Sequence, residues 1–177
     1  MFKYIINLVL IGLLSLSSLH AQTINTAASK ASFEVSNMAF RTVKGTLNGM
    51  QGTVDFDPQY PEKATFEVCI IANSIDTKSK KRDDHLKKDD FFNILQYPKI
   101  CFSSNTVQKS NTGFSTRGQL TMLGISKEIK ILFTSVNNVL KGSFKLNRLD
   151  FGLGADTGSF LIGKEVTVDI ECVLNKN

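Results

Sequence analysis

The sequence predicts an all-β protein of about eight antiparallel strands, and two observations carry this prediction. Apolar side chains recur at every second position in short runs between residues 32 and 170, which is the period of a strand with one buried face. Glycines and the turn-forming pairs Asp57-Pro58 and Tyr60-Pro61 separate many of these runs. The length of 177 residues suits one domain, and 42% hydrophobic residues suffice for a core.

Taken in chain order, each expected strand alternates apolar positions with polar ones. The apolar positions are Phe33 and Val35; Val54 and Phe56; Phe66, Val68 and Ile70; Ile100 and Phe102; Leu120 and Met122; Ile129, Ile131 and Phe133; Leu140, Phe144 and Leu146; and Val166, Val168 and Ile170. Such strands bury their apolar faces in a sandwich or in a closed barrel. A barrel of eight strands is either filled by its own side chains or holds one small ligand, and periodicity does not distinguish the two.

One stretch, from about residue 78 to 95, interrupts the alternation. Charged residues dominate it, and Asp76, Thr77 and Ser79 are suitable helix N-caps. We expect a helix over residues 79–88, a second short turn that begins at Asp90, and extended chain before Pro98. The sequence therefore predicts a short helical insert within the β domain.

The first residues have the character of a secretory signal peptide. Lys3 precedes an apolar run, small and polar residues follow, and we place cleavage after Ala21. The apolar run is short for a membrane-spanning helix. We therefore expect an exported protein, periplasmic or secreted, whose mature domain covers residues 22–177 and has no stable membrane insertion.

Three cysteines leave two alternatives open. Cys69 and Cys101 both lie at positions of opposite parity to their apolar neighbours, so they form a disulfide if their strands pair, and otherwise are two unpaired thiols. Cys172 continues the alternation of Val166, Val168 and Ile170, which predicts a small buried side chain.

At this point the order of several short motifs resembles a known family. The motifs are S-I-D-T (Ser74 to Thr77), R-D-D-H-L (Arg82 to Leu86), D-F-F-N (Asp90 to Asn93), Y-P-K-I-C-F (Tyr97 to Phe102) and, near the C-terminus, D-F-G-L-G with I-G-K-E-V-T-V-D-I. In this order and spacing they resemble the YceI-like family of exported lipid- and polyisoprenoid-binding proteins. The resemblance implies an elongated, lipocalin-like barrel whose interior accommodates a polyisoprenoid or a fatty chain.

Two departures limit what the resemblance carries over. Asn37 and Met38 stand where family members often have a histidine or an aromatic residue, and Cys69 and Cys101 occupy strand positions that are commonly polar. We therefore carry over the fold and the class of ligand, and no specific head-group site.

The ligand-binding candidates are the side chains expected to face the interior. They are Phe33, Val35, Phe56, Phe66, Val68, Ile70, Phe102, Leu120, Met122, Ile131, Phe144, Val168 and Ile170. Each methylene that a ligand buries among them contributes about 0.8 kcal/mol, so a long tail can bind without any catalytic or metal-ligating group. The alternative is that each of these residues is plain core.

The R-D-D-H-L motif also permits a catalytic interpretation, because Arg82, Asp83 and His85 could orient a phosphate or act as acid and base. We favour a helix-start ion pair and a histidine packed at the rim of the barrel. Aspartates nearly balance the lysines around the motif, and stacking aromatics are missing, so nucleic-acid binding is not expected. Contact with a pyrophosphate or an anionic membrane surface stays open.

The inventory of reactive residues argues against an enzyme. His20 leaves with the signal peptide, so His85 is the only histidine of the mature chain, and we expect no metal site and no cofactor. No nucleophile elbow, phosphate-binding loop or dinucleotide fingerprint is present.

Two classes of function therefore remain. The first is a carrier or storage protein for an isoprenoid or another long-chain lipid. The second is a ligand-free module that contacts a protein partner through the helical insert or the loop from Gly152 to Gly158. The sequence leaves the oligomeric state open.

Overall fold

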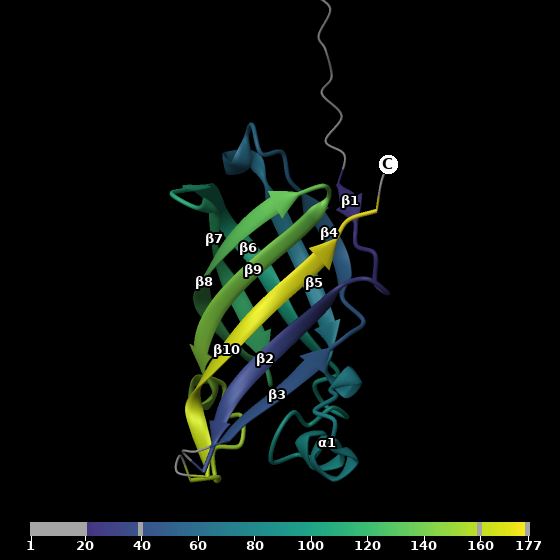
Figure 1. Cartoon of the computed structure of the whole chain (residues 1–177), viewed down its shortest axis with the longest axis vertical. Coiled ribbons are helices and arrows are strands. Elements are labelled where there is room, and N and C mark those ends of the chain that lie inside the picture. Colours follow the sequence, from purple (N-terminus) through teal and green to yellow (C-terminus); the bar gives the residue numbers. More distant parts are fainter. Residues whose placement is uncertain (1–20, 39–40, 159–160, 176–177) are drawn as a thin grey trace, which may run out of the picture.

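A computed structural model describes residues 21–38, 41–158 and 161–175. The predicted signal peptide, except for Ala21, lies outside these residues. One antiparallel sheet of ten strands forms the fold, in the spatial order β1-β4-β5-β6-β7-β8-β9-β10-β2-β3 (Figure 1). The strands are β1 (Gln22–Thr23), β2 (Lys30–Asn37), β3 (Arg41–Leu47), β4 (Gln51–Asp55), β5 (Thr65–Ile71), β6 (Lys99–Ser110), β7 (Gly113–Met122), β8 (Ile125–Val136), β9 (Val139–Asn147) and β10 (Ile162–Val173).

The all-β prediction is confirmed, but the predicted number of about eight strands is wrong. The two unpredicted strands are β1, which has only two residues, and β3. In β3 the inward positions are Val43, Gly45 and Leu47, so a glycine interrupts the apolar alternation. The ring of Phe33 covers Gly45, since a Cβ added there would lie only 2.5 Å from Phe33 Cζ. An aromatic ring from β2 thus supplies the apolar surface that β3 lacks.

The sheet curls into an incomplete barrel whose edge strands are β1 and β3 (Figure 1). At the upper end of the view, β1 pairs with β4, and Ile24 forms a bridge to Leu174 just beyond β10. Further down, Thr46 of β3 forms a bridge to Asp76, with N to O distances of 2.9 and 3.0 Å. These bridges, rather than a continuous ladder between β3 and β4, close the wall.

Four aromatic rings fill the upper end of the interior. Phe56 contacts Phe114 edge-on at a centroid distance of 5.0 Å, and Phe66 contacts Phe133 at 5.5 Å. Phe56 also meets the rings of Phe66 and Phe133. Edge-on pairs of this kind stabilise a core beyond the area they bury, so the four rings form an aromatic cluster at this end of the interior.

At the lower end lies the predicted helical insert. Helix α1 covers Lys80–Leu86, shorter than the expected 79–88, and the chain around Asp90 forms the expected short turn. Both Phe91 and Phe92 are buried. Gly154 has φ +59°, and its N–H donates to Asp90 O at 3.1 Å, so the loop after Gly152 packs directly on these turns.

Three short 3-10 segments complete the chain, at Pro61–Lys63, Ala72–Ser74 and Arg148–Phe151. No helix in the described ranges is long and apolar enough to cross a membrane.

The three cysteines form one disulfide and leave one buried thiol. Cys69 of β5 and Cys101 of β6 are partners in register and form a disulfide. Cys172 is unpaired, and it is buried, as its place in the alternation predicts. Burial raises the pKa of its thiol to about 11, which keeps it protonated at neutral pH.

Candidate ligand-binding cavity

Below the aromatic end, the strands line a cavity of about 200 Å³, which we call the lower cavity. Side chains from β2, β3, β5, β6, β7, β9 and β10 form its wall, because inward positions alternate along each strand. Leu86 of α1, the neighbouring Phe91 and Phe92, and Leu153 of the opposite loop line its α1 end. The lining is almost entirely aliphatic and aromatic.

Ten of the thirteen predicted site residues line this lower cavity. They are Phe33, Val35, Val68, Ile70, Phe102, Leu120, Met122, Phe144, Val168 and Ile170. Phe66 and Ile131 instead line a second space of about 90 Å³ nearer the aromatic end, which we call the upper cavity. Phe56 lines neither cavity and belongs to the aromatic cluster. Strand parity identified inward positions correctly, but it carries no information about their height along the barrel.

Other lining residues were not among the predicted site residues. Ile100, Leu146 and Val166 share the parity of predicted neighbours, so the pattern already contained them. Val43 and Leu47 lie on the unpredicted β3. Met50, Ile75, Leu86, Leu153 and Ile162 come from loops, α1 and strand ends, where no alternation marks the inward side.

Arg148, which no sequence pattern singled out, is the largest buried polar side chain at the cavity, with 2% of its surface exposed. Its five hydrogen bonds all go to backbone carbonyls: Nε donates to Gly163 at 3.0 Å, Nη1 to Leu153 at 2.7 Å and Gly154 at 2.6 Å, and Nη2 to Thr157 at 3.1 Å and Ile162 at 3.0 Å. Burial lowers the pKa of its guanidinium. Arg148 thereby binds the segment 153–157 and the start of β10 at the lower end of the interior.

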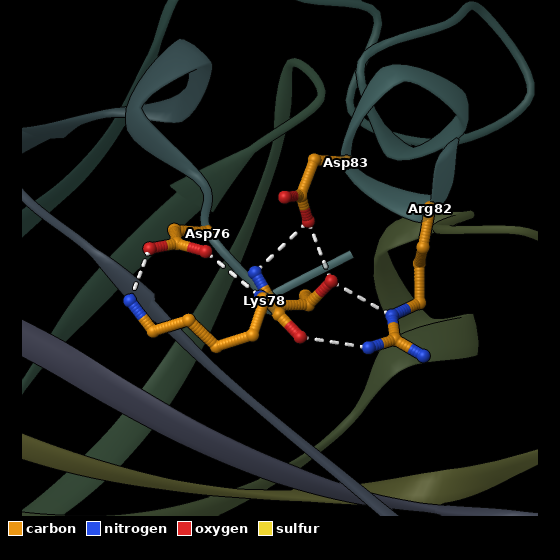
Figure 2. A network of polar contacts seen from close by, with 5 residues as sticks. Asp76, Lys78, Arg82 and Asp83 are labelled. Atoms are coloured by element: carbon orange, nitrogen blue, oxygen red, sulfur yellow. Dashed lines mark hydrogen bonds and ion pairs between the residues drawn. The ribbon is translucent and has the colours of Figure 1, made fainter. Parts of the chain in front are cut away.

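Arg82 brings a second cation to the lining, at the start of α1 (Figure 2). Its Nε donates to Thr77 Oγ1 at 2.7 Å and its Nη2 to Thr77 O at 2.8 Å. The hydroxyl and N–H of Thr77 donate to Asp83 Oδ1 at 2.5 and 2.9 Å. Arg82 Nη1 has no hydrogen-bond partner among the described residues, and the side chain is half-buried, so this nitrogen remains accessible.

The neighbouring ion pair is a surface feature. Lys78 donates to Asp76 through its Nζ at 2.7 Å and its backbone N–H at 2.8 Å, and these bonds lower the pKa of the Asp76 carboxyl.

His85 Nε2 lies 2.7 Å from Asp90 Oδ2, and its ring packs edge-on against Phe91 at 4.9 Å. The expected rim position of His85 agrees with this geometry.

Arg82 and Arg148 both line the lower cavity, whereas no aspartate or glutamate does. Within the described ranges, no three His, Cys, Asp or Glu side chains gather in a way that could hold a metal ion. The arrangement suits the burial of an apolar chain, with positive charge at one end.

This fold and interior define a barrel-type β protein with an apolar cavity. A family model described as the YceI-like domain matches residues 22–174, so the chain belongs to the YceI-like family. The resemblance drawn from the motifs is therefore confirmed. Among curated proteins, a UPF0312 protein of Pectobacterium atrosepticum is 27% identical over 156 residues, covering 81% of this chain and 80% of its own.

Solved structures agree on the fold. A YceI protein of Campylobacter jejuni matches with a TM-score of 0.71 at 27% identity, over 78% of this chain and 88% of its own. BcnA of Burkholderia cenocepacia matches with a TM-score of 0.76 at 21% identity, over 86% of this chain and 99% of its own. A polyisoprenoid-binding domain from Saccharophagus degradans matches with a TM-score of 0.68 at 15% identity, over 89% of this chain and 99% of its own. At the identities of the last two, the likeness shows the fold alone.

Proposed function

We propose that this protein binds one polyisoprenoid or other long-chain lipid, with the tail in the lower cavity. The observation that carries the proposal is an apolar cavity of about 200 Å³ lined by residues of seven strands, α1 and the neighbouring loops. Apolar concavities with few polar groups are the usual form of sites for small apolar ligands. Family membership and a related fold described as polyisoprenoid-binding support the same class of ligand.

The energetics require no reaction. Each buried methylene contributes about 0.8 kcal/mol, so a tail of about twelve carbons offers roughly 10 kcal/mol before the costs of ordering it. Micromolar affinity requires about 8 kcal/mol. We therefore propose a carrier or storage protein rather than an enzyme.

We propose further that the head group is anionic and lies at the α1 end. Arg82 and Arg148 are the charged groups of the lining, and no aspartate or glutamate lines the cavity with them. Arg148 has committed its donors to carbonyls, whereas Arg82 Nη1 has no partner among the described residues. A carboxylate or phosphate oxygen at Nη1 would gain a charge-assisted hydrogen bond.

Export to the periplasm or the medium is part of the proposal. The signal-peptide character of residues 1–21 supports it, and so does the Cys69–Cys101 disulfide, because such bonds persist mainly in oxidising compartments.

The first test is native mass spectrometry of protein purified from membrane-containing cells, followed by organic extraction and lipid analysis. We expect a bound isoprenoid or acyl species in the native protein and its loss in Val168→Trp, because the indole fills the cavity that Val168 lines. Asp169→Trp is the matched control, since the exposed Asp169 neighbours Val168 on the outer face. Protein that carries no lipid and takes up none would favour the partner-binding module instead.

A second test addresses the head group. Arg82→Gln should weaken the binding of a fatty acid roughly tenfold or more, since a charge-assisted hydrogen bond is lost, and should leave the alcohol of the same chain length unaffected. Calorimetric titration of delipidated protein measures both. Lys81→Gln, on the exposed side of α1, should change neither affinity. Equal losses for acid and alcohol in Arg82→Gln would contradict the anionic site.

A further inference from the structure

The two cavities lie one above the other and share four lining residues. Met50, Val68, Phe102 and Ile170 line both the lower cavity and the upper cavity. We call these four side chains the partition. The upper cavity beyond it, of about 90 Å³, is lined by Val54, Phe66, Thr116, Ile131, Phe133, Leu140, Gly142 and Cys172, which gives it the same apolar character.

The order of inward residues along the strands places the partition between the cavities. On β5, Ile70 lines the lower cavity, Val68 both and Phe66 the upper; on β10 the same order is Val168, Ile170 and Cys172. Val68 and Phe102 are partners in register on β5 and β6, and Met50 reaches the interior from the connection between β3 and β4. The partition therefore crosses the barrel at one level.

Side chains rather than backbone separate the two spaces. Leu120 of β7 lines the lower cavity and Thr116 the upper, with Gly118 at the inward position between them. A Cβ added at Gly118 would lie 2.6 Å from Phe102 Cζ, so the Phe102 ring occupies the space that the glycine leaves. The Phe102 ring thus lies against the wall at the level that the two cavities share.

We propose that Phe102, with Met50 beside it, sets the maximum length of the tail that the protein accepts. This inference rests on the proposed lipid binding. A tail that enters from the α1 end runs past Val168 and Leu120 and meets the partition before it can reach the upper cavity. Carbons beyond that point bury no further surface in the native protein.

The experiment is a calorimetric titration of delipidated protein with straight-chain saturated fatty acids from octanoate to docosanoate. In the native protein, affinity should rise roughly fourfold for each added methylene and then level off at the length that reaches Phe102. In Phe102→Ala, the rise should continue for several more carbons, and the longest acids should bind at least tenfold more tightly than they bind the native protein.

Phe144→Ala is the matched control, because Phe144 lines the lower cavity alone. It removes the same atoms but opens no route to the upper cavity, so its affinity should level off at the native length. Met50→Ala and Phe102→Leu provide the same comparison if Phe102→Ala does not fold, as judged by circular dichroism.

The outcomes separate this inference from the proposed function. Native protein that binds no acid of the series would overturn the lipid-binding proposal and this inference with it. Native protein that binds, but whose affinity levels off at the same length in the partition variants, would overturn the role of Phe102 alone. An affinity that rises without a break across the series in the native protein would also overturn it.

Discussion

At the scale of single residues, Arg148 shows how a cation can be buried without a carboxylate. A guanidinium has five N–H donors in a fixed plane, and carbonyl oxygens of residues 153, 154 and 157 and of the first two residues of β10 accept from its nitrogens. Lysine has a single nitrogen and cannot reproduce this set of bonds. The side chain therefore ties the residues after β9 to the start of β10.

We predict that Arg148→Lys lowers the free energy of unfolding by about 3 kcal/mol, since buried carbonyls lose their donors. Urea denaturation followed by circular dichroism measures this change. Arg117→Lys is the control, because Arg117 is exposed and its contact with Glu128 is 3.4 Å long, so the effect should stay within about 0.5 kcal/mol. A loss for Arg148→Lys no larger than that of the control would contradict the assigned role.

Arg148 was not predictable from sequence. Nothing in its neighbours marks it as buried, since it follows β9 at a strand end, where arginines are normally solvated. Its partners lie five to fifteen residues later, in turns and at the start of β10, and only the folded chain determines the directions of their carbonyls.

At the scale of elements, the disulfide between β5 and β6 closes a chain segment that contains α1 and the turns after it. The two cysteines are separated by 32 positions in sequence. In the chain-entropy model a closed loop of this size stabilises the folded state by about 3 to 4 kcal/mol, because the unfolded chain has fewer conformations.

Cys69→Ser/Cys101→Ser should therefore unfold at a lower urea concentration, with a loss of about 3 kcal/mol. Dithiothreitol should lower the stability of the native protein by a similar amount and leave the double variant unchanged. If the reductant shifts both proteins equally, or neither, the bridge does not contribute as proposed.

Strand β3 shows where element prediction fails. Alternation requires a side chain at each inward position, and Gly45 provides none. What makes the segment a strand is its ladder with β2, from Arg41 opposite Asn37 to Leu47 opposite Ala31, and the cover from Phe33. Both are contacts with another strand, which a local pattern cannot reveal.

At the scale of the whole molecule, a ligand that fills the cavity must stabilise the fold, because it binds the folded chain and not the unfolded one. Delipidated protein should gain about 2.7 kcal/mol when a bound fatty acid is present at a hundred times its Kd. Thermal unfolding at increasing fatty acid concentration measures this gain. Val168→Trp should show no increase, and an equal increase in that variant would place the lipid outside the lower cavity.

The sequence by itself determined the all-β class, the position of the helical insert, the family and the inward parity of the site residues. Each of these depends on local periodicity or on short motifs, which a single chain displays without its fold. Only the tertiary structure decided that ten strands share one sheet, that Phe56 lies among the aromatic rings, that Arg148 is buried and that Phe102 lines two cavities. These features depend on the height of a residue along the barrel and on its neighbours across strands, and both are set by register and closure of the sheet.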